Sequence, residues 1–129
     1  MTPWLTEQQI EDAALQFFQN LGYDYVHGSV IAPDGDHPER ESYADVLLLG
    51  RLKTAIQRLN RGLDPASHDE AVRKILRLDS PSLIANNESF HDLLVQGVTV
   101  ELAGKKGETV YPCVKLVDFD KPEANDFLV

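Results

Sequence analysis

A change of hydrophobic period at Gly97 constrains the fold of this 129-residue chain more than any other feature. Before Gly97, apolar residues recur every three or four positions in several separate segments, which is the spacing of amphipathic helices. After it, apolar residues alternate in 98–102 and again in 110–116, on either side of the turn sequence GKKG. Alternation around a glycine-rich turn predicts a β-hairpin. Helices followed by paired strands predict an α+β fold, close to the α/β class.

The first helix is predicted from its ends as well as from its period. Thr6 and Gln9 have the spacing of a capping box, and Gly22 is suited to the left-handed conformation that often follows a helix. The next ten residues, YDYVHGSVIA at 23–32, are rich in aromatic and β-branched side chains and predict a strand. The helical period also predicts that one apolar face packs in the core: Ile10, Ala13, Ala14, Phe17 and Leu21.

The middle of the chain predicts a small helical array. An apolar stripe from Leu48 to Leu59 is closed by Gly62, and a helix with Ser67 as N-cap is expected to run to Asp79. Ser80 and Pro81 then open a short turn, and a further helix through Phe90, Leu93 and Leu94 ends at Gly97.

The expected sheet is incomplete. One early strand, two hairpin strands and the apolar end Phe127–Val129 are too little sheet to cover four helices. We therefore divide one domain, 1–129, into a helix and strand at 1–32, a helical insertion at 40–97, and a hairpin with a strand start at 98–129. An exposed sheet edge near Phe127 would favour self-association.

Charge is unevenly distributed. The net charge of −9 argues against the whole chain binding a polyanion, but 51–77 holds seven bases against three acids. An ordinary solvated helix face is the simpler interpretation, and contact with DNA or a protein partner is the functional one. The candidate contact residues are Arg51, Lys53, Arg58, Arg61, Arg73, Lys74 and Arg77.

Several classes of protein and site receive no support. The sequence has no apolar run of membrane-spanning length and no basic N-terminal signal, which predicts a soluble, cytoplasmic protein. The single cysteine, Cys113, is predicted to be a small core residue. His27, His37, His68 and His91 lack zinc-ligand spacing, and the acidic loop DGDHPERE at 34–41 lacks the pattern of a calcium loop.

Asp45, before the apolar run VLLLG, is a possible metal-binding carboxylate at a strand edge. A magnesium-dependent nuclease also needs a second acid and a lysine, usually as D/E-x-K. No lysine of the chain has an acid two positions before it, so the complete set is absent from these residues.

Four stretches together resemble the N-terminal region of the restriction (R, HsdR) subunit of type I restriction-modification enzymes. They are LTEQQIEDAALQFFQNLGYDYVHG, RESYADVLLLGRLKTAIQRLN, DSPSLIANNESFHDLLVQGVTVE and VDFDKPEANDFLV. The resemblance covers nearly the whole chain.

This resemblance implies the first part of a PD-(D/E)xK nuclease domain in a large ATP-driven endonuclease that cleaves unmethylated foreign DNA. It implies Mg²⁺ and ATP as cofactors of the full-length protein, and methyltransferase and specificity subunits as partners. The family's catalytic aspartate and E-x-K pair lie on strands that follow the NDFLV segment, so the chain alone is expected to be inactive and to bind neither cofactor. One family position is present: the first-helix glutamate, Glu11, which in such nucleases can approach the metal.

Two other functions remain open. The acidic shell and helical array would suit a stand-alone protein-interaction module. The basic segment 51–77 would suit a metal-independent DNA-binding element, for which salt-sensitive duplex binding is expected.

Overall fold

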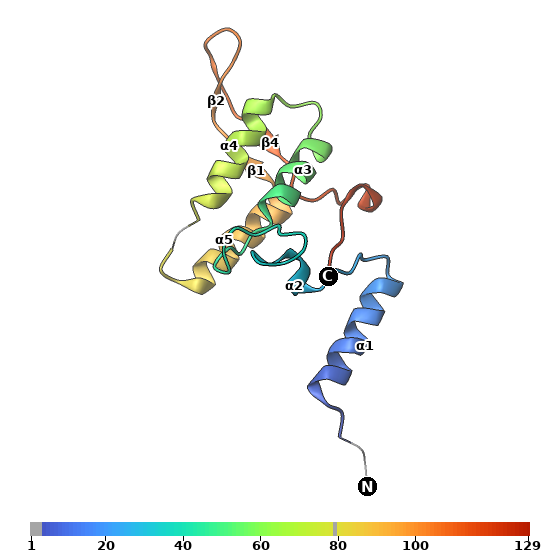
Figure 1. Cartoon of the computed structure of the whole chain (residues 1–129). Helices are drawn as coiled ribbons and strands as arrows, with labels where there is room; N and C mark the ends of the chain where they lie inside the picture. The colour runs from blue at the N-terminus through green and yellow to red at the C-terminus, as the bar shows by residue number, and fades with distance from the viewer. Residues whose placement is uncertain (1–3, 79) are drawn as a thin grey trace. The chain divides into compact units, whose positions relative to one another are not determined.

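The computed structural model describes residues 4–78 and 80–129. Over these residues it contains five α-helices, one 3₁₀ helix and two small antiparallel sheets of two strands each (Figure 1). The α+β prediction is confirmed. No helix in the described part of the chain is long and apolar enough to cross a membrane. The elements are α1 Glu7–Asn20, α2 Gly28–Ile31, α3 Leu49–Leu59, α4 Pro65–Leu76, α5 Leu83–Gln96, β1 Val98–Thr99, β2 Leu102–Ala103, β3 Thr109–Val110, β4 Cys113–Val114 and η1 Pro122–Ala124.

The chain forms two compact units. The first comprises Met1–Val46 and Asp126–Val129, and the second comprises Leu47–Asn125. The second unit is therefore one continuous stretch of sequence set between the two parts of the first. Each unit is defined by the contacts within it.

In the first unit, the local signals for α1 are confirmed. The Thr6 hydroxyl accepts the N–H of Gln9 at 3.2 Å, and the Gln9 side chain accepts the N–H of Thr6 at 2.9 Å. Gly22 follows the helix with a φ of +97°, a conformation that side chains other than glycine rarely adopt. The ends of a helix can be predicted because they depend on residues only three or four positions apart.

The predicted burial of the α1 apolar face is wrong for this structure. None of the helix residues is buried, and Ile10, Phe17 and Leu21 are each more than half exposed. Phe17 of this face contacts the ring of the neighbouring Phe18, which leads to two further aromatic contacts. Phe18 packs on Tyr23, and Tyr23 packs on Phe127, with ring centroids 5.1 Å apart in both pairs. The apolar stripe is present, but the only β pairing among the described residues of this unit is the isolated bridge between Asp24 and Leu128, which is too small to cover it.

The predicted strand at 23–32 is only partly formed. Asp24 and Leu128 form an isolated parallel bridge, in which the Asp24 N–H donates to the Phe127 carbonyl at 2.8 Å. The expected strand start at Phe127–Val129 thus pairs with the beginning of this segment. Beyond it the chain turns into α2, because the His27 ring accepts the N–H of Ser29 at 3.2 Å and caps a helical turn.

The second unit has the main hydrophobic core. Helices α3 and α4 pack together, and α4 also packs on β1 and β4. In the hairpin, Val98 pairs with Val114, and Leu102 pairs with Val110. The buried core residues are Ile56, Ala71, Val72, Ile75, Val98, Val100, Val114 and Leu116. The predicted hairpin and its inward-facing valines at 98, 100 and 114 are confirmed.

Two helix starts differ from the prediction. Helix α4 begins at Pro65 with Asp64 as N-cap, whereas Ser67 lies within the helix and is 2% exposed. Proline is favoured in the first helical turn, where its missing N–H is not needed, so it prevails over the Ser67 capping pattern. Ser80 was predicted to cap a separate short turn before a further helix, whereas the one helix of this region, α5, begins at Leu83 with Ser82 as its N-cap.

The C-terminal end was predicted correctly for α5 but not for α4. Helix α4 ends at Leu76, short of the predicted end, and Asp79 itself lies outside the described residues. Helix α5 ends at Gly97 as predicted, with a φ of +82° at that glycine.

The prediction that Cys113 is a core residue is wrong. Cys113 is exposed, and its thiol donates to the Gln96 carbonyl with a sulfur–oxygen distance of 3.4 Å. Side chains alternate between the two faces of a strand. Since Val114 and Leu116 face the core, Cys113 points to the other side.

A buried amide joins the end of α3 to the return strand of the hairpin. Asn60 donates from Nδ2 to the carbonyls of Ile56 and Lys115, each at 2.8 Å. Its Oδ1 accepts the N–H of Lys115, also at 2.8 Å. The side chain thereby pairs with both backbone groups of Lys115, as a neighbouring strand would. Asn86 makes the same double contact with the backbone of Ser80.

Candidate functional site

Glu11 lies on α1 and is exposed. Its carboxylate makes no hydrogen bond or ion pair with the described part of the chain, whereas Asp12, one position on, accepts from Gln8 at 2.9 Å. Within residues 4–78 and 80–129, no three His, Cys, Asp or Glu side chains are grouped so that they could hold a metal ion. Glu11 is therefore available for contacts with other groups, but this chain supplies no ligand set around it.

Asp45, the other candidate carboxylate, has a local structural role. Its Oδ2 accepts the N–H groups of Glu41 and Ser42, each at 3.0 Å. A side-chain oxygen shared by two successive amides stabilises a turn. The nearby acidic loop is also stabilised by a carboxylate, because Asp34 accepts a hydrogen bond from the Tyr43 hydroxyl. This hydrogen bond is the main reason that the pKa of Tyr43 is raised above 10.0.

The basic residues of α4 interact with neighbours in their own unit. Arg73 and Arg77 approach the Glu70 carboxylate at 2.8 Å and 3.4 Å. The hydrogen bond from Arg73 is the largest cause of a pKa for Glu70 below its ordinary value. Lys74 donates from Nζ to the Thr99 carbonyl at 2.8 Å, from α4 to the open edge of β1. All three cations thus have partners within the protein.

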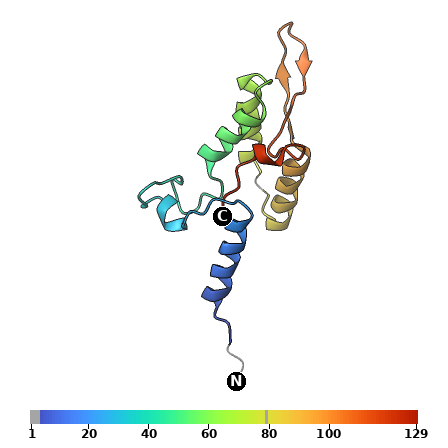
Figure 2. The ribbon, with the colours of Figure 1, turned by 90° about the vertical axis from the view of Figure 1, so that its right-hand side faces the viewer.

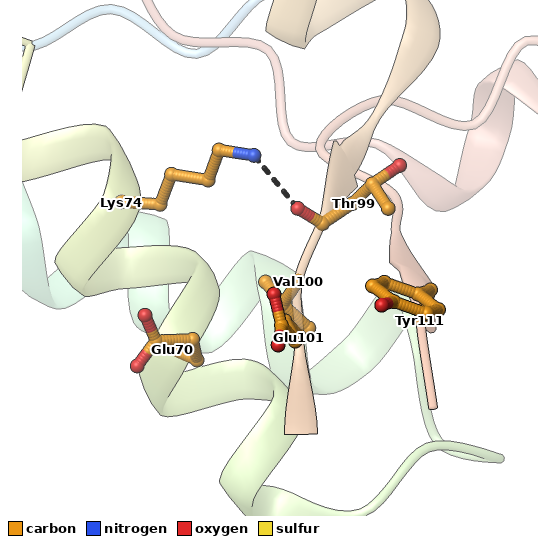
Figure 3. Close-up of a pocket in the computed structure, with 6 residues that line it drawn as sticks. All are labelled: Glu70, Lys74, Thr99, Val100, Glu101 and Tyr111. Carbon is orange, nitrogen blue, oxygen red and sulfur yellow. Dashed lines mark hydrogen bonds between the residues drawn. The ribbon is translucent and has the colours of Figure 1, made fainter. Parts of the chain in front are cut away.

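Figure 3 shows the surface pocket beside this lysine. Its volume is about 370 Å³, and Lys74 reaches across to the strand carrying Thr99, Val100 and Glu101. Glu70 lies on the helix side and Tyr111 on the strand side. The pocket combines one cation, two carboxylates and a phenol. It lacks a nucleophile paired with a base, so its geometry supports polar binding rather than covalent catalysis.

The basic residues on and after α3 divide into two groups. Arg58 donates from Nε to the Ala124 carbonyl at 3.0 Å, while its buried Nη2 has no acceptor. Arg51 also has an interaction partner. Lys53 and Arg61 are exposed, and neither side chain is hydrogen-bonded or ion-paired to any described residue. The structure therefore does not gather the seven predicted bases into one uniform face.

The acidic segment 118–125 forms an ordered loop around an asparagine. Asn125 accepts the N–H of Asp118 and donates to its carbonyl, both at 2.8 Å. Asp118 in turn accepts the N–H groups of Asp120 and Lys121 at 3.1 and 3.0 Å. The bond from the Lys121 N–H is the main reason that the pKa of Asp118 lies below the ordinary value of 3.8.

We expect this loop to loosen in acid. A carboxyl whose pKa is lowered by folding adds stability above its unfolded pKa, and this stability is lost as the pH falls through the folded pKa. The Asp118 contribution should therefore be complete above about pH 5 and decline below pH 3.8. Carboxyl-carbon NMR titration should give Asp118 a midpoint below that of a denatured control. In Asp118→Asn the amide oxygen can still accept both N–H groups, so order in the loop should no longer follow this titration.

Two lysines in the hairpin turn, Lys105 and Lys106, were not among the predicted contact residues. Both are exposed at the tip between β2 and β3, and their side chains have no partner within the described chain. The sequence did contain a signal, since two adjacent bases in a predicted glycine-flanked turn must project from the surface. What it could not show was that the cations of α4 are paired while those of the turn are free.

Comparison with known proteins relates this chain to one family and to two curated proteins whose names agree with that family. The family model described as "Type I restriction enzyme R protein N terminus" matches residues 5–129. A protein of Methanocaldococcus jannaschii named as a type I restriction enzyme MjaIXP endonuclease subunit is 36% identical over 120 residues. That match covers 93% of this chain and 11% of the relative.

A second relative, the type I restriction enzyme HindI endonuclease subunit of Haemophilus influenzae, is 32% identical over 124 residues, or 96% of this chain and 12% of that protein. The chain thus spans about one ninth of the length of the curated relatives that it matches. No solved structure matches.

Proposed function

The chain belongs to the family of type I restriction enzyme R protein N termini, and from this premise we propose that it forms the first part of the nuclease domain of a restriction subunit. The family match over residues 5–129 is the observation that carries the proposal. Both relatives are named as endonuclease subunits, which supports the same role. In that role the protein acts with methyltransferase and specificity subunits in the cytoplasm and contributes to ATP-dependent cleavage of unmethylated foreign DNA.

The metal required for such cleavage does not fit the residues of this chain. Among residues 4–78 and 80–129, Glu11 belongs to no group of three His, Cys, Asp or Glu side chains that could hold a metal ion, and Asp45 uses one carboxylate oxygen to accept two backbone amides. The sequence also has no D/E-x-K pair. We therefore derive no catalytic step from these residues. We propose instead that these residues form the scaffold on which the rest of the nuclease domain is built. The chain alone is therefore expected to leave plasmid DNA intact.

The exposed face of α1 agrees with a scaffold role. Ile10, Phe17 and Leu21 form an apolar stripe more than half exposed on a helix with no basic residue. Apolar patches of this kind mark surfaces that other elements cover. The relatives have about eight times the length of this chain, which is ample for a sheet that covers this face.

The same exposed face favours the alternative, a stand-alone interaction module whose partner covers α1. The coding DNA after the codon for Val129 distinguishes the two. We expect an open frame that encodes an aspartate strand and an E-x-K sequence within a few tens of residues. An immediate stop codon would contradict the nuclease proposal and favour the interaction module.

Glu11 is the one residue of this chain that we propose to act near the nuclease centre of the whole subunit. In a full-length subunit, Glu11→Gln is expected to lower DNA cleavage about tenfold or more, the usual effect of losing a group that supports a metal site. ATP hydrolysis should be unchanged. The matched control is Glu7→Gln on the same helix. Equal cleavage by the two variants would show that Glu11 is an ordinary surface acid.

A further inference from the structure

The tip of the hairpin presents two lysines on a well-defined turn. Gly104 and Gly107 flank Lys105 and Lys106, and the Gly107 N–H donates to the Gly104 carbonyl at 3.1 Å. Gly107 has a φ of +80°, which favours glycine at that position. The two lysines therefore occupy the central positions of a hydrogen-bonded turn. The turn forms the end of the ribbon made by β2 and β3 (Figures 1 and 2), and both lysines are exposed.

These lysines differ from the bases of α4 in being free. Neither Lys105 nor Lys106 makes a side-chain hydrogen bond or ion pair with the residues that the structure describes. By contrast, Arg73 and Arg77 are bound to Glu70, and Lys74 is bound to a backbone carbonyl. A cation already paired within the protein must give up that partner before it binds an external anion, whereas the turn lysines need only lose water. Lys53 and Arg61 are likewise unpaired in the part of the chain that the structure describes, but Lys105 and Lys106 are adjacent to each other and lie together at the hairpin turn.

The hairpin turn lies beside the start of α4. A pocket of about 490 Å³ is lined there by hairpin residues and by Asp64 and Ser67. The α3–α4 connection, which carries the exposed Arg61, leads into that start (Figure 1). Two acids are also present there, Asp64 and Glu108. The Glu108 carboxylate accepts the Lys106 N–H at 2.9 Å and stabilises the turn.

We propose that this hairpin tip, defined by Lys105 and Lys106, contacts the phosphate backbone of duplex DNA. The inference rests on the proposed function. It places the DNA contact at the hairpin tip instead of at the basic residues of α4. A lysine ammonium binds phosphate as a point charge, and a two-stranded ribbon fits the major groove of B-DNA. The chain's net charge of −9 would orient a polyanion away from the acidic surfaces and toward these free cations.

Duplex binding by the 129-residue chain at a series of salt concentrations tests this proposal. Each phosphate contact contributes about 0.9 to the slope of log K against log salt concentration. The double variant Lys105→Gln, Lys106→Gln should therefore reduce the magnitude of the slope by about 1.8. A control with the same change of charge, Lys115→Gln with Lys121→Gln, alters two exposed lysines elsewhere in the second unit and should keep the wild-type slope. The charge-retaining variant Lys105→Arg, Lys106→Arg should also keep it.

Three results would overturn the inference: equal slopes for the tip and control variants, loss of binding in the Arg variant, or no retardation of duplex DNA by the wild-type chain at low salt. None of them would remove the proposed nuclease scaffold, because that proposal depends on the coding sequence beyond Val129. Conversely, a stop codon after Val129 together with a tip-dependent slope would leave DNA binding in place and remove the nuclease role.

Discussion

Replacing Asn60 with alanine is expected to lower the free energy of unfolding of the unit Leu47–Asn125 by about 3 kcal/mol. Asn60 is 6% exposed, and its amide satisfies both the N–H and the carbonyl of Lys115. Each buried group left without a partner costs about 1–3 kcal/mol, whereas an intact hydrogen bond contributes only about 1 kcal/mol. The loss therefore comes chiefly from the two unpaired backbone groups.

Urea unfolding followed by circular dichroism measures this change. With a slope of about 1–3 kcal/mol/M for a small protein, the midpoint should fall by about 1–3 M. Asn87→Ala is the matched control, because Asn87 is exposed on α5 and its replacement should change the free energy of unfolding by no more than about 0.5 kcal/mol. Asn60→Asp should be at least as harmful as Asn60→Ala, since it cannot donate to Lys115 and buries a charge. Similar midpoints for Asn60→Ala and Asn87→Ala would contradict the bridging role.

Ile56→Ala is expected to destabilise the same unit by about 2–5 kcal/mol. Ile56 is completely buried in the core formed by α3, α4 and the base of the hairpin. Removing three side-chain carbons loses their transfer free energy and leaves a cavity that the surrounding side chains fill only in part. The effect should appear as a lower urea midpoint with an unchanged slope.

Ile84→Ala is the matched control for this prediction. Ile84 lies on α5 and is 79% exposed, so its truncation should cost less than about 0.5 kcal/mol. A large loss at Ile84 would mean that this face of α5 is covered in solution. Its dependence on protein concentration would then show whether a second copy of the chain covers it.

The features predicted correctly from the sequence are those set by nearby residues. The capping box at Thr6 and Gln9, the end of α5 at Gly97 and the hairpin turn at Gly104–Gly107 each depend on residues within a few positions. The i, i+3 spacing of Glu70 and Arg73 was also visible in the sequence, although the prediction counted these charges without pairing them.

The features missed depend on residues far apart in the chain. Asn60 bonds to a residue 55 positions away, and Lys74 bonds to one 25 positions away, so neither role follows from local spacing. The α1 stripe was correctly identified as apolar, but burial also requires a partner surface, and amphipathic spacing says nothing about whether that surface is present. This long-range dependence explains why the fold class could be predicted from local patterns, whereas the partners of the candidate site residues could not.

The most direct test of the central claim is restriction by a chimeric enzyme. Residues 5–129 would replace the matching region of the Haemophilus influenzae HindI endonuclease subunit, which is 32% identical, and the chimera would be expressed with the other subunits of that enzyme. A subunit lacking this region serves as the negative control. We predict that the chimera restricts unmodified phage DNA while the deletion does not. A chimera that is stably expressed and still hydrolyses ATP in response to DNA, yet restricts no better than the deletion, would contradict the claim that this chain is a nuclease-domain scaffold.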